Sequence, residues 1–296
     1  MADQSPQLWN VLGLLNWTQG YFARTGLDVA RLAAEVLLAH VLGCERISLY
    51  TRFDYQPAPA ELADFRRLVE RAARREPIAY LVGEKEFYSL RLKVTPDVLI
   101  PRPETEILVE QAVGHLRRLG RACTVWDVCA GSGCVAVAVA ANVAEATVLV
   151  TDISPPAVAL AEENAATHKL TARIRCRQAD LLDLPGDCGD MSPFDVLACN
   201  PPYVAETDEV AQEVAYEPSA ALYAGEDGLE CIRPLIHHAA EFIASGGAVA
   251  MEFGCGQADV VRNLLADTGQ FAEPEIIRDR QGIERAAVAI KKSPAP

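Results

Sequence analysis

Apolar residues recur at helical spacing in three segments near the start of the chain. The first segment includes Val11, Leu12 and Leu15, the second covers residues 29–42, and the third covers residues 59–75. A spacing of three and four residues places such side chains on one face of a helix. The pattern therefore predicts that the chain begins with a helical domain, over about 76 residues.

The apolar pattern changes to a period of two over residues 78–99, which is typical of strands. This stretch is rich in residues that favour strands, namely Phe87, Tyr88, Leu90, Leu92 and Val94. Pro101 and Pro103 follow, and acidic residues after a proline are common in the first turn of a helix. We expect a β-hairpin that links two domains, and then a helix over residues 104–119.

Beyond residue 120, strand-like and helix-like segments alternate. The segments are residues 124–128, 135–141, 147–150, 156–167, 172–177 and 194–199, and after a long loop 229–244, 248–252, 257–268, 275–278 and 285–290. Short apolar strands separated by helices indicate a sheet that is covered on both faces. The sequence therefore predicts an α/β domain with a doubly wound, mostly parallel sheet.

Composition narrows the class of protein. The chain has 296 residues, 50% of them hydrophobic, and a net charge of −14. That charge disfavours stable binding to a nucleic-acid backbone, which needs a basic surface. The longest apolar stretch, residues 134–141, is too short to span a membrane, and the first basic residue is Arg24, so we expect no secretory signal. We expect a cytoplasmic protein.

The nine cysteines form no Cys-x-x-Cys pair, and an odd number cannot all pair with one another. We expect reduced, mostly buried thiols and no metal site. Five arginines crowd the third helical segment: Arg66, Arg67, Arg71, Arg74 and Arg75. A solvated face is the commoner explanation of such a run, and a docking surface for an acidic partner is the alternative.

A glycine-rich turn marks a candidate nucleoside site. Residues 127–134 read Asp-Val-Cys-Ala-Gly-Ser-Gly-Cys between a predicted strand and a predicted helix. Glycines there let the backbone approach a ligand closely. The next strand ends at Asp152, nineteen residues after Gly133, where a carboxylate can accept both ribose hydroxyls. The turn lacks the pattern of a triphosphate-binding loop.

The tetrapeptide Asn200-Pro201-Pro202-Tyr203 directly follows a predicted central strand. Ligands of open α/β sheets bind at the carboxyl ends of such strands. Two prolines remove two N–H donors, so the Asn200 side-chain oxygen and the Pro201 carbonyl can each accept a hydrogen bond from a planar –NH₂ group. Tyr203 offers a flat face to the same group. The alternative interpretation is that the tetrapeptide forms a rigid turn with a purely structural role.

Together these two motifs resemble a class I S-adenosylmethionine-dependent methyltransferase that acts on planar nitrogen. Four further segments resemble the HemK/PrmC family of protein-glutamine methyltransferases. They are residues 76–83, residues 98–106 (Val-Leu-Ile-Pro-Arg-Pro-Glu-Thr-Glu), residues 226–229, and Asp279 with residues 282–285. The resemblance covers residues 8 to 290.

The resemblance implies a Rossmann-like domain with a mostly parallel seven-stranded sheet and a small all-α N-terminal domain joined by a β-hairpin. The expected boundaries are 1–76, 77–102 and 103–296. It implies a monomer that methylates a glutamine, in a Gly-Gly-Gln motif, of a peptide chain release factor. The implied catalytic residues are Asn200, Pro201, Pro202 and Tyr203, and the implied S-adenosylmethionine contacts are Cys129, Ala130, Gly131, Ser132, Gly133, Asp152, Asp180, Leu181, Asn200 and Arg102.

Two positions depart from the family pattern. Cys129 and Ala130 stand where relatives usually carry glycine and threonine, and we expect an ordinary negative φ at Cys129 because it has a Cβ. Leu181 stands where many relatives carry an aromatic residue beside the adenine, so stacking would be weaker.

Three other functions stay open at this point. A ribosomal protein is an alternative glutamine-bearing substrate, since its methyltransferase has a similar cysteine-containing loop. An adenine-N6 nucleic-acid methyltransferase shares the tetrapeptide but needs a basic recognition surface. A non-enzymatic binding module would not need Asn200.

Overall fold

The computed structural model describes residues 9–293, so the outer ends of the predicted domains, residues 1–8 and 294–296, lie outside the described residues. The chain divides into two compact units. The first, called here the N-terminal unit, comprises Met1–Glu84 together with Ala211–Tyr216. The second, called here the sheet unit, comprises Lys85–Val210 and Glu217–Pro296.

The N-terminal unit is helical. Its elements are α1 (Val11–Arg24), α2 (Ala30–Val41), a 3₁₀ helix (Arg46–Thr51), α3 (Pro59–Ala72) and the short α4 (Ile78–Val82). Asn10 caps α1 by accepting a hydrogen bond from the Gly13 N–H at 2.8 Å. Most side chains of the faces predicted from the spacing of apolar residues are buried, as at Val11, Leu15 and Phe65. Leu12 is the exception, because it lies off the buried face of α1 and is 39% exposed. The predicted helical character of this part of the chain is therefore present.

The arginines of α3 and of the turn that follows it are largely neutralised within the N-terminal unit; α3 ends at Ala72, three residues before the predicted end of this helix. Arg66 pairs with Glu70, Arg67 with Asp64, and Arg71 with Glu76. Arg75 donates to Glu213 at 2.9 Å and to the backbone carbonyls of Thr25 and Gly26. Glu213 belongs to residues 211–216, which explains why this short segment groups with the helices.

The expectation that a strand pattern begins at Ile78 is wrong. Ile78–Val82 is helix α4, which Pro77 precedes and Gly83 ends with a left-handed φ of 78°. Ile78, Leu81 and Val82 pack against the N-terminal core, and this burial favours the helix over the strand period. The hairpin consists only of β1 (Glu84–Phe87) and β2 (Leu90–Lys93).

The sheet unit contains a seven-stranded sheet in the order β5-β4-β3-β6-β7-β9-β8. Its strands are β3 (Cys123–Val128), β4 (Ala146–Asp152), β5 (Ile174–Gln178), β6 (Phe194–Cys199), β7 (Ile243–Glu252), β8 (Glu275–Arg278) and β9 (Glu284–Ile290). Neighbouring strands are parallel from β5 to β7, and β9 is antiparallel to both β7 and β8. The prediction of a mostly parallel, doubly wound sheet is confirmed.

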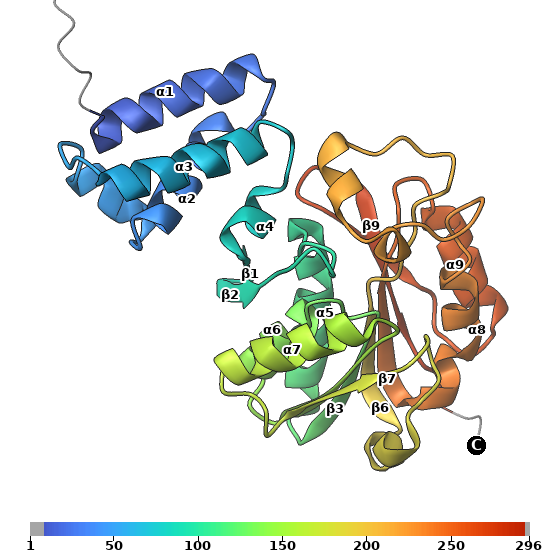
Figure 1. Ribbon diagram of the computed structural model, residues 1–296. Helices are drawn as coiled ribbons and strands as arrows, with labels where there is room; N and C mark the ends of the chain where they lie inside the picture. Colours follow the sequence, from blue (N-terminus) through green and yellow to red (C-terminus); the bar gives the residue numbers. More distant parts are fainter. Residues whose placement is uncertain (1–8, 294–296) are drawn as a thin grey trace, which may run out of the picture. The chain divides into compact units, whose positions relative to one another are not determined.

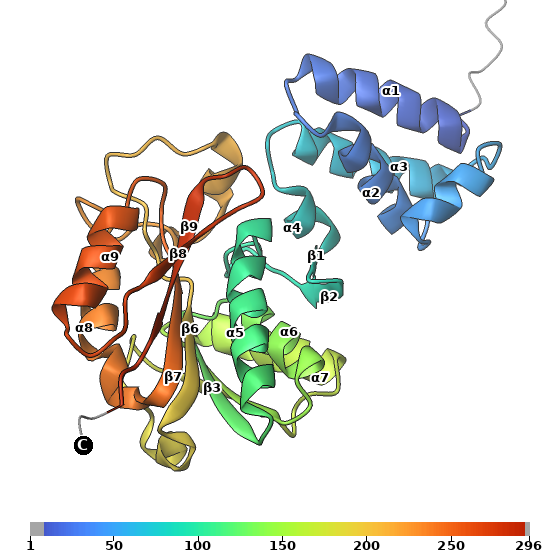
Figure 2. The same ribbon diagram turned by 180° about the vertical axis from the view of Figure 1, so that it is seen from behind.

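Helices cover both faces of this sheet, as Figures 1 and 2 show from opposite sides. One face packs against α5 (Glu106–Leu119), α6 (Cys134–Asn142) and α7 (Pro155–Thr167), and the other against α8 (Ile232–Phe242) and α9 (Ala258–Asp267). Successive side chains of β3 illustrate the division, because Val125 faces the first layer and Trp126 the second. The predicted helix over residues 229–244 is shorter in the structure, since β7 begins at Ile243.

The strand order reverses direction at β3. The chain moves outward from β3 through β4 to β5, and then returns to the other side of β3 as β6. In open α/β sheets the carboxyl ends of the strands beside such a reversal form a crevice. The loops that follow β3, β4 and β6 therefore converge at one edge.

All nine cysteines lie within the described residues and are free thiols, five of them buried. Among the residues the structure describes, none of the helices is long and apolar enough to cross a membrane.

Gly133 serves the packing of α6 against α7. Its φ is +73°, and a Cβ at this position would lie 2.9 Å from the Cβ of Ala161 on α7. Gly131, two residues earlier, also has a positive φ of +53°, but a Cβ there would have no neighbour within 4 Å. The two glycines thus share a backbone conformation and differ in the space around them.

This difference makes the first prediction. Gly131→Ala adds only the strain of a left-handed residue and lowers the free energy of unfolding by about 1 kcal/mol. Gly133→Ala adds overpacking against Ala161 and lowers it by about 2–4 kcal/mol. Urea unfolding of both variants without ligand measures this. Equal losses would show that the contact with Ala161 relaxes without cost.

Candidate active site

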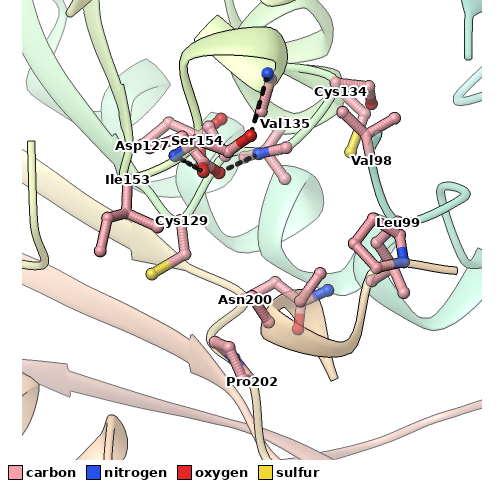
Figure 3. A pocket seen from close by; sticks show the side chains of 18 of the residues that line it. Val98, Leu99, Asp127, Cys129, Cys134, Val135, Ile153, Ser154, Asn200 and Pro202 are labelled. Carbon is pink, nitrogen blue, oxygen red and sulfur yellow. Dashed lines mark hydrogen bonds between the residues drawn. The ribbon is translucent and has the colours of Figure 1, made fainter. Parts of the chain in front are cut away.

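A cavity of about 370 Å³ opens at the carboxyl ends of the central strands. Its walls come from the loops after β3, β4, β5 and β6, together with residues 97–102 and 218–223. Figure 3 shows Asn200 and Pro202 at one end of this cavity and Asp127 and Ser154 at the other. The volume suits a small organic ligand, for which pockets of about 300–1,000 Å³ are usual.

The loop after β3 forms the floor of the cavity through Cys129, Ala130, Gly131 and Ser132. The expectation of an ordinary φ at Cys129 is wrong, because its φ is +55°. The turn from β3 into α6 is fixed on either side by hydrogen bonds from the Ala130 N–H to the Thr151 carbonyl and from the Gly133 N–H to the Ala130 carbonyl. These bonds impose the left-handed conformation on cysteine, at a cost of about 1–2 kcal/mol.

Two carboxylates anchor this loop. Asp127 is buried and accepts a hydrogen bond from the Ala136 N–H, in the first turn of α6, at 2.9 Å. Asp152 accepts from the Gly131 N–H at 2.8 Å through one oxygen and from the Ser154 N–H at 2.9 Å through the other. Burial raises the pKa of Asp127 to about 7, and burial also raises the pKa of Asp152, opposed by the N–H groups of Ser154 and Gly131.

The cavity has acceptors and apolar walls that suit a nucleoside. A carboxylate has about four acceptor positions, and the two backbone N–H groups use two of those on Asp152, so two remain for ribose hydroxyls. Ile153 and Leu181 supply apolar walls beside it, and Ile153 is 56% exposed although it is a large hydrophobic residue. Asp180 also lines the cavity next to Leu181, whose φ of 43° is again left-handed.

Asn200 follows the last residue of β6, and its amide has one satisfied and one unsatisfied end. The Nδ2 group donates to Thr105 Oγ1 at 3.1 Å. The Oδ1 atom is buried and has no hydrogen-bond partner within the described part of the chain. Since a buried acceptor without a partner costs about 1–3 kcal/mol, this oxygen is a ready site for an N–H donor from a ligand.

The other residues of the tetrapeptide are placed differently. Pro202 lines the cavity, Pro201 is buried, and the Tyr203 hydroxyl donates to Glu252 Oε1 at 3.1 Å. Burial raises the pKa of Tyr203, so the hydroxyl keeps its proton and acts as a donor. The predicted flat face of Tyr203 is thus part of a polar network and not of the cavity wall as the structure defines it.

The side chain of Gln257 and the close approach of Gly228 hold the backbone at Tyr203. The Gln257 Nε2 group donates to the Tyr203 carbonyl at 3.1 Å, and the Gln257 Oε1 atom accepts from the Gly254 N–H at 2.8 Å. Gly228, with a φ of +71°, approaches so closely that a Cβ there would lie 2.3 Å from the Tyr203 carbonyl oxygen. This approach explains physically why a glycine stands at residue 228.

Arg102 lines the cavity and is paired with a buried carboxylate. Its Nη2 group donates to Glu217 Oε1 at 2.5 Å, and the other Glu217 oxygen accepts from the Ile100 N–H at 3.1 Å. The Glu217 side chain is 1% exposed, so Arg102 neutralises a charge that water does not reach.

The structure therefore brings most of the residues predicted for the site to one cavity. Those that line it are Arg102, Cys129, Ala130, Gly131, Ser132, Asp152, Asp180, Leu181, Asn200 and Pro202. Gly133, Pro201 and Tyr203 support it from outside the wall.

Thr105, Glu252 and Gln257 are site residues that were not predicted from the sequence. Thr105 lay within a motif already noted, but Glu252 and Gln257 carry no local signal, because their role depends on contacts across 147 and 54 residues of chain. No group of three or more His, Cys, Asp or Glu side chains within residues 9–293 is arranged to hold a metal ion. His237 and His238 lie exposed on α8, as expected for a helix surface.

Comparisons with known proteins identify the family of this chain. Residues 13–83 match the family model "PrmC N-terminal domain", and residues 104–227 match "Methyltransferase small domain". The catalytic domain of hMettl16, solved with an RNA hairpin, shares the fold, with a TM-score of 0.55, 14% identity, and coverage of 78% of this chain and 81% of that one.

Curated relatives extend the match to nearly the whole chain. The Release factor glutamine methyltransferase of Geobacter sulfurreducens is 42% identical over 285 residues, covering 95% of this chain and 97% of that protein. The protein of the same name from Rhodopirellula baltica is 40% identical over 295 residues, covering 96% and 98%. Methyltransferases of this kind use S-adenosylmethionine, and the cavity described above has the acceptors and apolar walls to hold it. The chain belongs to the release factor glutamine methyltransferase family.

Proposed function

We propose that this protein transfers the methyl group of S-adenosylmethionine to the side-chain amide nitrogen of a glutamine, in the Gly-Gly-Gln motif of a peptide chain release factor. The observation that carries the proposal is the buried, unpartnered Oδ1 of Asn200 at the carboxyl end of β6. A primary amide supplies the N–H donor that this oxygen lacks. We further propose that the enzyme acts as a monomer in the cytoplasm, where release factors work.

The chemical difficulty lies in the nucleophile. An amide nitrogen is weakly nucleophilic because its lone pair is delocalised into the carbonyl. Bound S-adenosylmethionine supplies a methyl group made electrophilic by its sulfonium. The protein's own part is to hold the nitrogen in line with that methyl group and to stabilise the positive charge that develops on it.

Asn200 Oδ1 and the Pro201 carbonyl are the acceptors proposed for this task. Each takes one N–H of the amide, which turns the nitrogen lone pair toward the methyl donor. Because Pro201 and Pro202 have no N–H, the backbone there presents acceptors without competing donors. The methylated, protonated amide is a strong acid and loses its proton to solvent, so the step needs no strong general base.

The methyl donor is proposed to lie between the glycine loop and the loop after β4. Asp152 would accept the ribose hydroxyls, Ile153 and Leu181 would flank the adenine, and Arg102 with Cys129–Ser132 would line the remainder. This arrangement leaves Asn200 and Pro202 at the other end of the cavity for the substrate (Figure 3).

The release factor is favoured over the alternative substrates by the relatives. Proteins that carry the name Release factor glutamine methyltransferase are 35–42% identical to this chain over nearly its full length. The net charge of −14 weighs against a nucleic-acid substrate. We propose that the N-terminal unit recognises the protein substrate, because it presents an apolar groove between α1 and α3 that includes Trp17.

The first prediction of the proposal concerns Asn200. Asn200→Ala removes one acceptor of the amide and lowers kcat at least ~10²-fold, the scale seen when a transition-state hydrogen bond is lost. Affinity for S-adenosylhomocysteine changes much less, because Pro201 and Pro202 still shape the loop. Steady-state kinetics with a release factor and calorimetry measure the two effects. As a control, Asn263→Ala on the exposed surface of α9 leaves both unchanged. Near-normal turnover with lost cofactor affinity would exclude the proposed role.

The second prediction concerns Asp152. Asp152→Ala removes an ionised hydrogen-bond acceptor and weakens S-adenosylmethionine binding by about 1–3 kcal/mol. Isothermal titration calorimetry measures this, and Asp187→Ala, which removes an exposed carboxylate paired with Arg177, serves as the control. Unchanged affinity in a folded Asp152→Ala protein would remove the ribose role from this residue.

The third prediction separates protein recognition from chemistry. Trp17 is 48% exposed in the groove of the N-terminal unit, and Ile47 is 74% exposed elsewhere on the same unit. Trp17→Ala raises KM for a whole release factor and leaves S-adenosylhomocysteine affinity unchanged, whereas Ile47→Ala changes neither. Both substitutions remove an exposed apolar side chain from the same unit, so equal effects on KM would contradict a docking role for the groove.

A further inference from the structure

A buried chain of hydrogen bonds connects the end of β7 to the side chain of Asn200. Glu252, the last residue of β7, is 1% exposed. Its Oε2 atom accepts from the Thr105 hydroxyl at 2.7 Å, and its Oε1 atom accepts from the Tyr203 hydroxyl at 3.1 Å. Thr105 Oγ1 in turn accepts from Asn200 Nδ2 at 3.1 Å.

The direction of these bonds follows from the chemistry of the groups. An ionised carboxylate can only accept hydrogen bonds, so Glu252 takes the single hydroxyl proton of Thr105. Thr105 Oγ1 then has only lone pairs left for Asn200, and the group of Asn200 that faces it must be the NH₂ donor. The other end of the amide, Oδ1, is thereby left unpartnered and directed away from Thr105.

We propose that Glu252 and Thr105 are positioning residues that fix the orientation of the Asn200 amide, so that its oxygen and not its NH₂ group meets the substrate nitrogen. The inference rests on the proposed function, in which the Asn200 oxygen accepts a hydrogen bond from the glutamine amide. Neither residue touches the reacting atoms in this role. They act through the Thr105 hydroxyl group, which donates to Glu252 and can therefore only accept from Asn200.

Loss of the negative charge on Glu252 removes this control. A protonated carboxyl, or an amide at this position, can donate to Thr105 Oγ1. The hydroxyl proton of Thr105 is then free to turn toward Asn200, where it pairs with Oδ1. The amide reverses, and an NH₂ group faces the substrate N–H with no acceptor between them.

Glu252 changes its protonation state within the physiological pH range. Burial raises its pKa to about 7, opposed by the hydroxyl groups of Thr105 and Tyr203. The charged groups that act on it are Glu104, which precedes Thr105 and raises the pKa, and Arg285 on β9, which lowers it. The Cys134 thiol on α6 is the further titratable group that interacts with it, and burial keeps that thiol protonated.

The kinetic test compares two buried carboxylates of the same sheet. Glu252→Gln lowers kcat about 10–100-fold, the range for residues that orient a primary contact, and leaves KM for S-adenosylmethionine nearly unchanged. Asp195→Asn, at the opposite end of β6, removes a buried carboxylate that pairs with Arg121 and Thr124, and it leaves kcat close to wild type despite a similar loss of stability. Equal kcat losses in both variants would overturn the proposal, because they would indicate a general structural effect.

Substitutions of Thr105 test the hydroxyl itself. Thr105→Val keeps the shape of the side chain and removes the relay, so kcat falls as in Glu252→Gln. Thr105→Ser restores the hydroxyl and recovers most of that loss. Failure of serine to recover more activity than valine would overturn the proposal.

The pH profile supplies a readout that a structural role would not move. The active form carries ionised Glu252, so kcat of the wild type falls as pH decreases through about 7. Glu252→Gln lacks this carboxyl, so its residual kcat loses the part of the acidic limb that Glu252 causes, whereas any contribution of Asp127, whose pKa burial also raises to about 7, is common to both proteins. An unchanged acidic limb in Glu252→Gln would overturn the proposal.

A measurement without substrate separates this inference from the proposed function. In protein labelled with ¹⁵N-asparagine, the Asn200 side-chain NH₂ resonance, assigned with Asn200→Ala, shifts with pH in the wild type and not in Glu252→Gln. If wild-type protein fails to methylate a release factor but shows this shift, the substrate assignment is wrong and the relay stands. If the enzyme methylates a release factor and the resonance does not respond to Glu252, the relay is wrong and the function stands.

Discussion

Carboxylates at the carboxyl edge of the sheet determine the course of the loops, and the orientation of the side chains, that surround the cavity. Asp127 near the end of β3 and Glu252 at the end of β7 are buried, and Asp152 at the end of β4 is half-buried in the wall of the cavity. A buried carboxylate is tolerated only when N–H or O–H groups surround it. The donors come from the chain that follows or crosses each strand, and the course of the loops is therefore dictated by these oxygens.

The consequence differs along the edge. At β3 and β4 the donors are backbone N–H groups, from Ala136, Gly131 and Ser154, so the carboxylates fix the course of the main chain. At β7 the donors are the hydroxyls of Thr105 and Tyr203, so the carboxylate fixes side chains instead. The carboxylates of β3 and β4 thus fix the loops that line the ligand cavity. The carboxylate of β7 is proposed to orient the side chain that contacts the substrate.

Much of this arrangement could be predicted from the sequence. The period of the apolar residues identifies the strands and helices of the sheet unit, and the motifs at residues 127–134 and 200–203 fall at the loops that form the cavity. Local patterns suffice here because parallel strands place their carboxyl ends at one edge. Any residue that ends such a strand is a candidate for the site.

Other features of the fold and the site depend on contacts between residues far apart in the sequence, which local patterns do not reveal. The hairpin turn at Tyr88 and Ser89 has φ values of 48° and 62° without a glycine, and the Tyr88 N–H is held by Glu106 across 18 residues. Residues 211–216 group with the N-terminal helices through Arg75, whose partner cannot be identified from spacing. At Cys129 the intrinsic preference of a residue with a Cβ predicts a negative φ. The hydrogen bonds of the neighbouring residues impose a positive φ instead, and the local sequence does not reveal them.

The left-handed conformation of Cys129 affects the conformational entropy of the backbone as well as its strain energy. A glycine at residue 129 would sample many more conformations in the unfolded chain and would remain freer in the folded loop. Cys129 samples fewer, so less backbone freedom is left to be lost when a ligand settles on the loop. The strain of about 1–2 kcal/mol is borne once, by folding, and does not recur at each turnover. The sheet unit thus meets its cofactor with a floor that is already rigid.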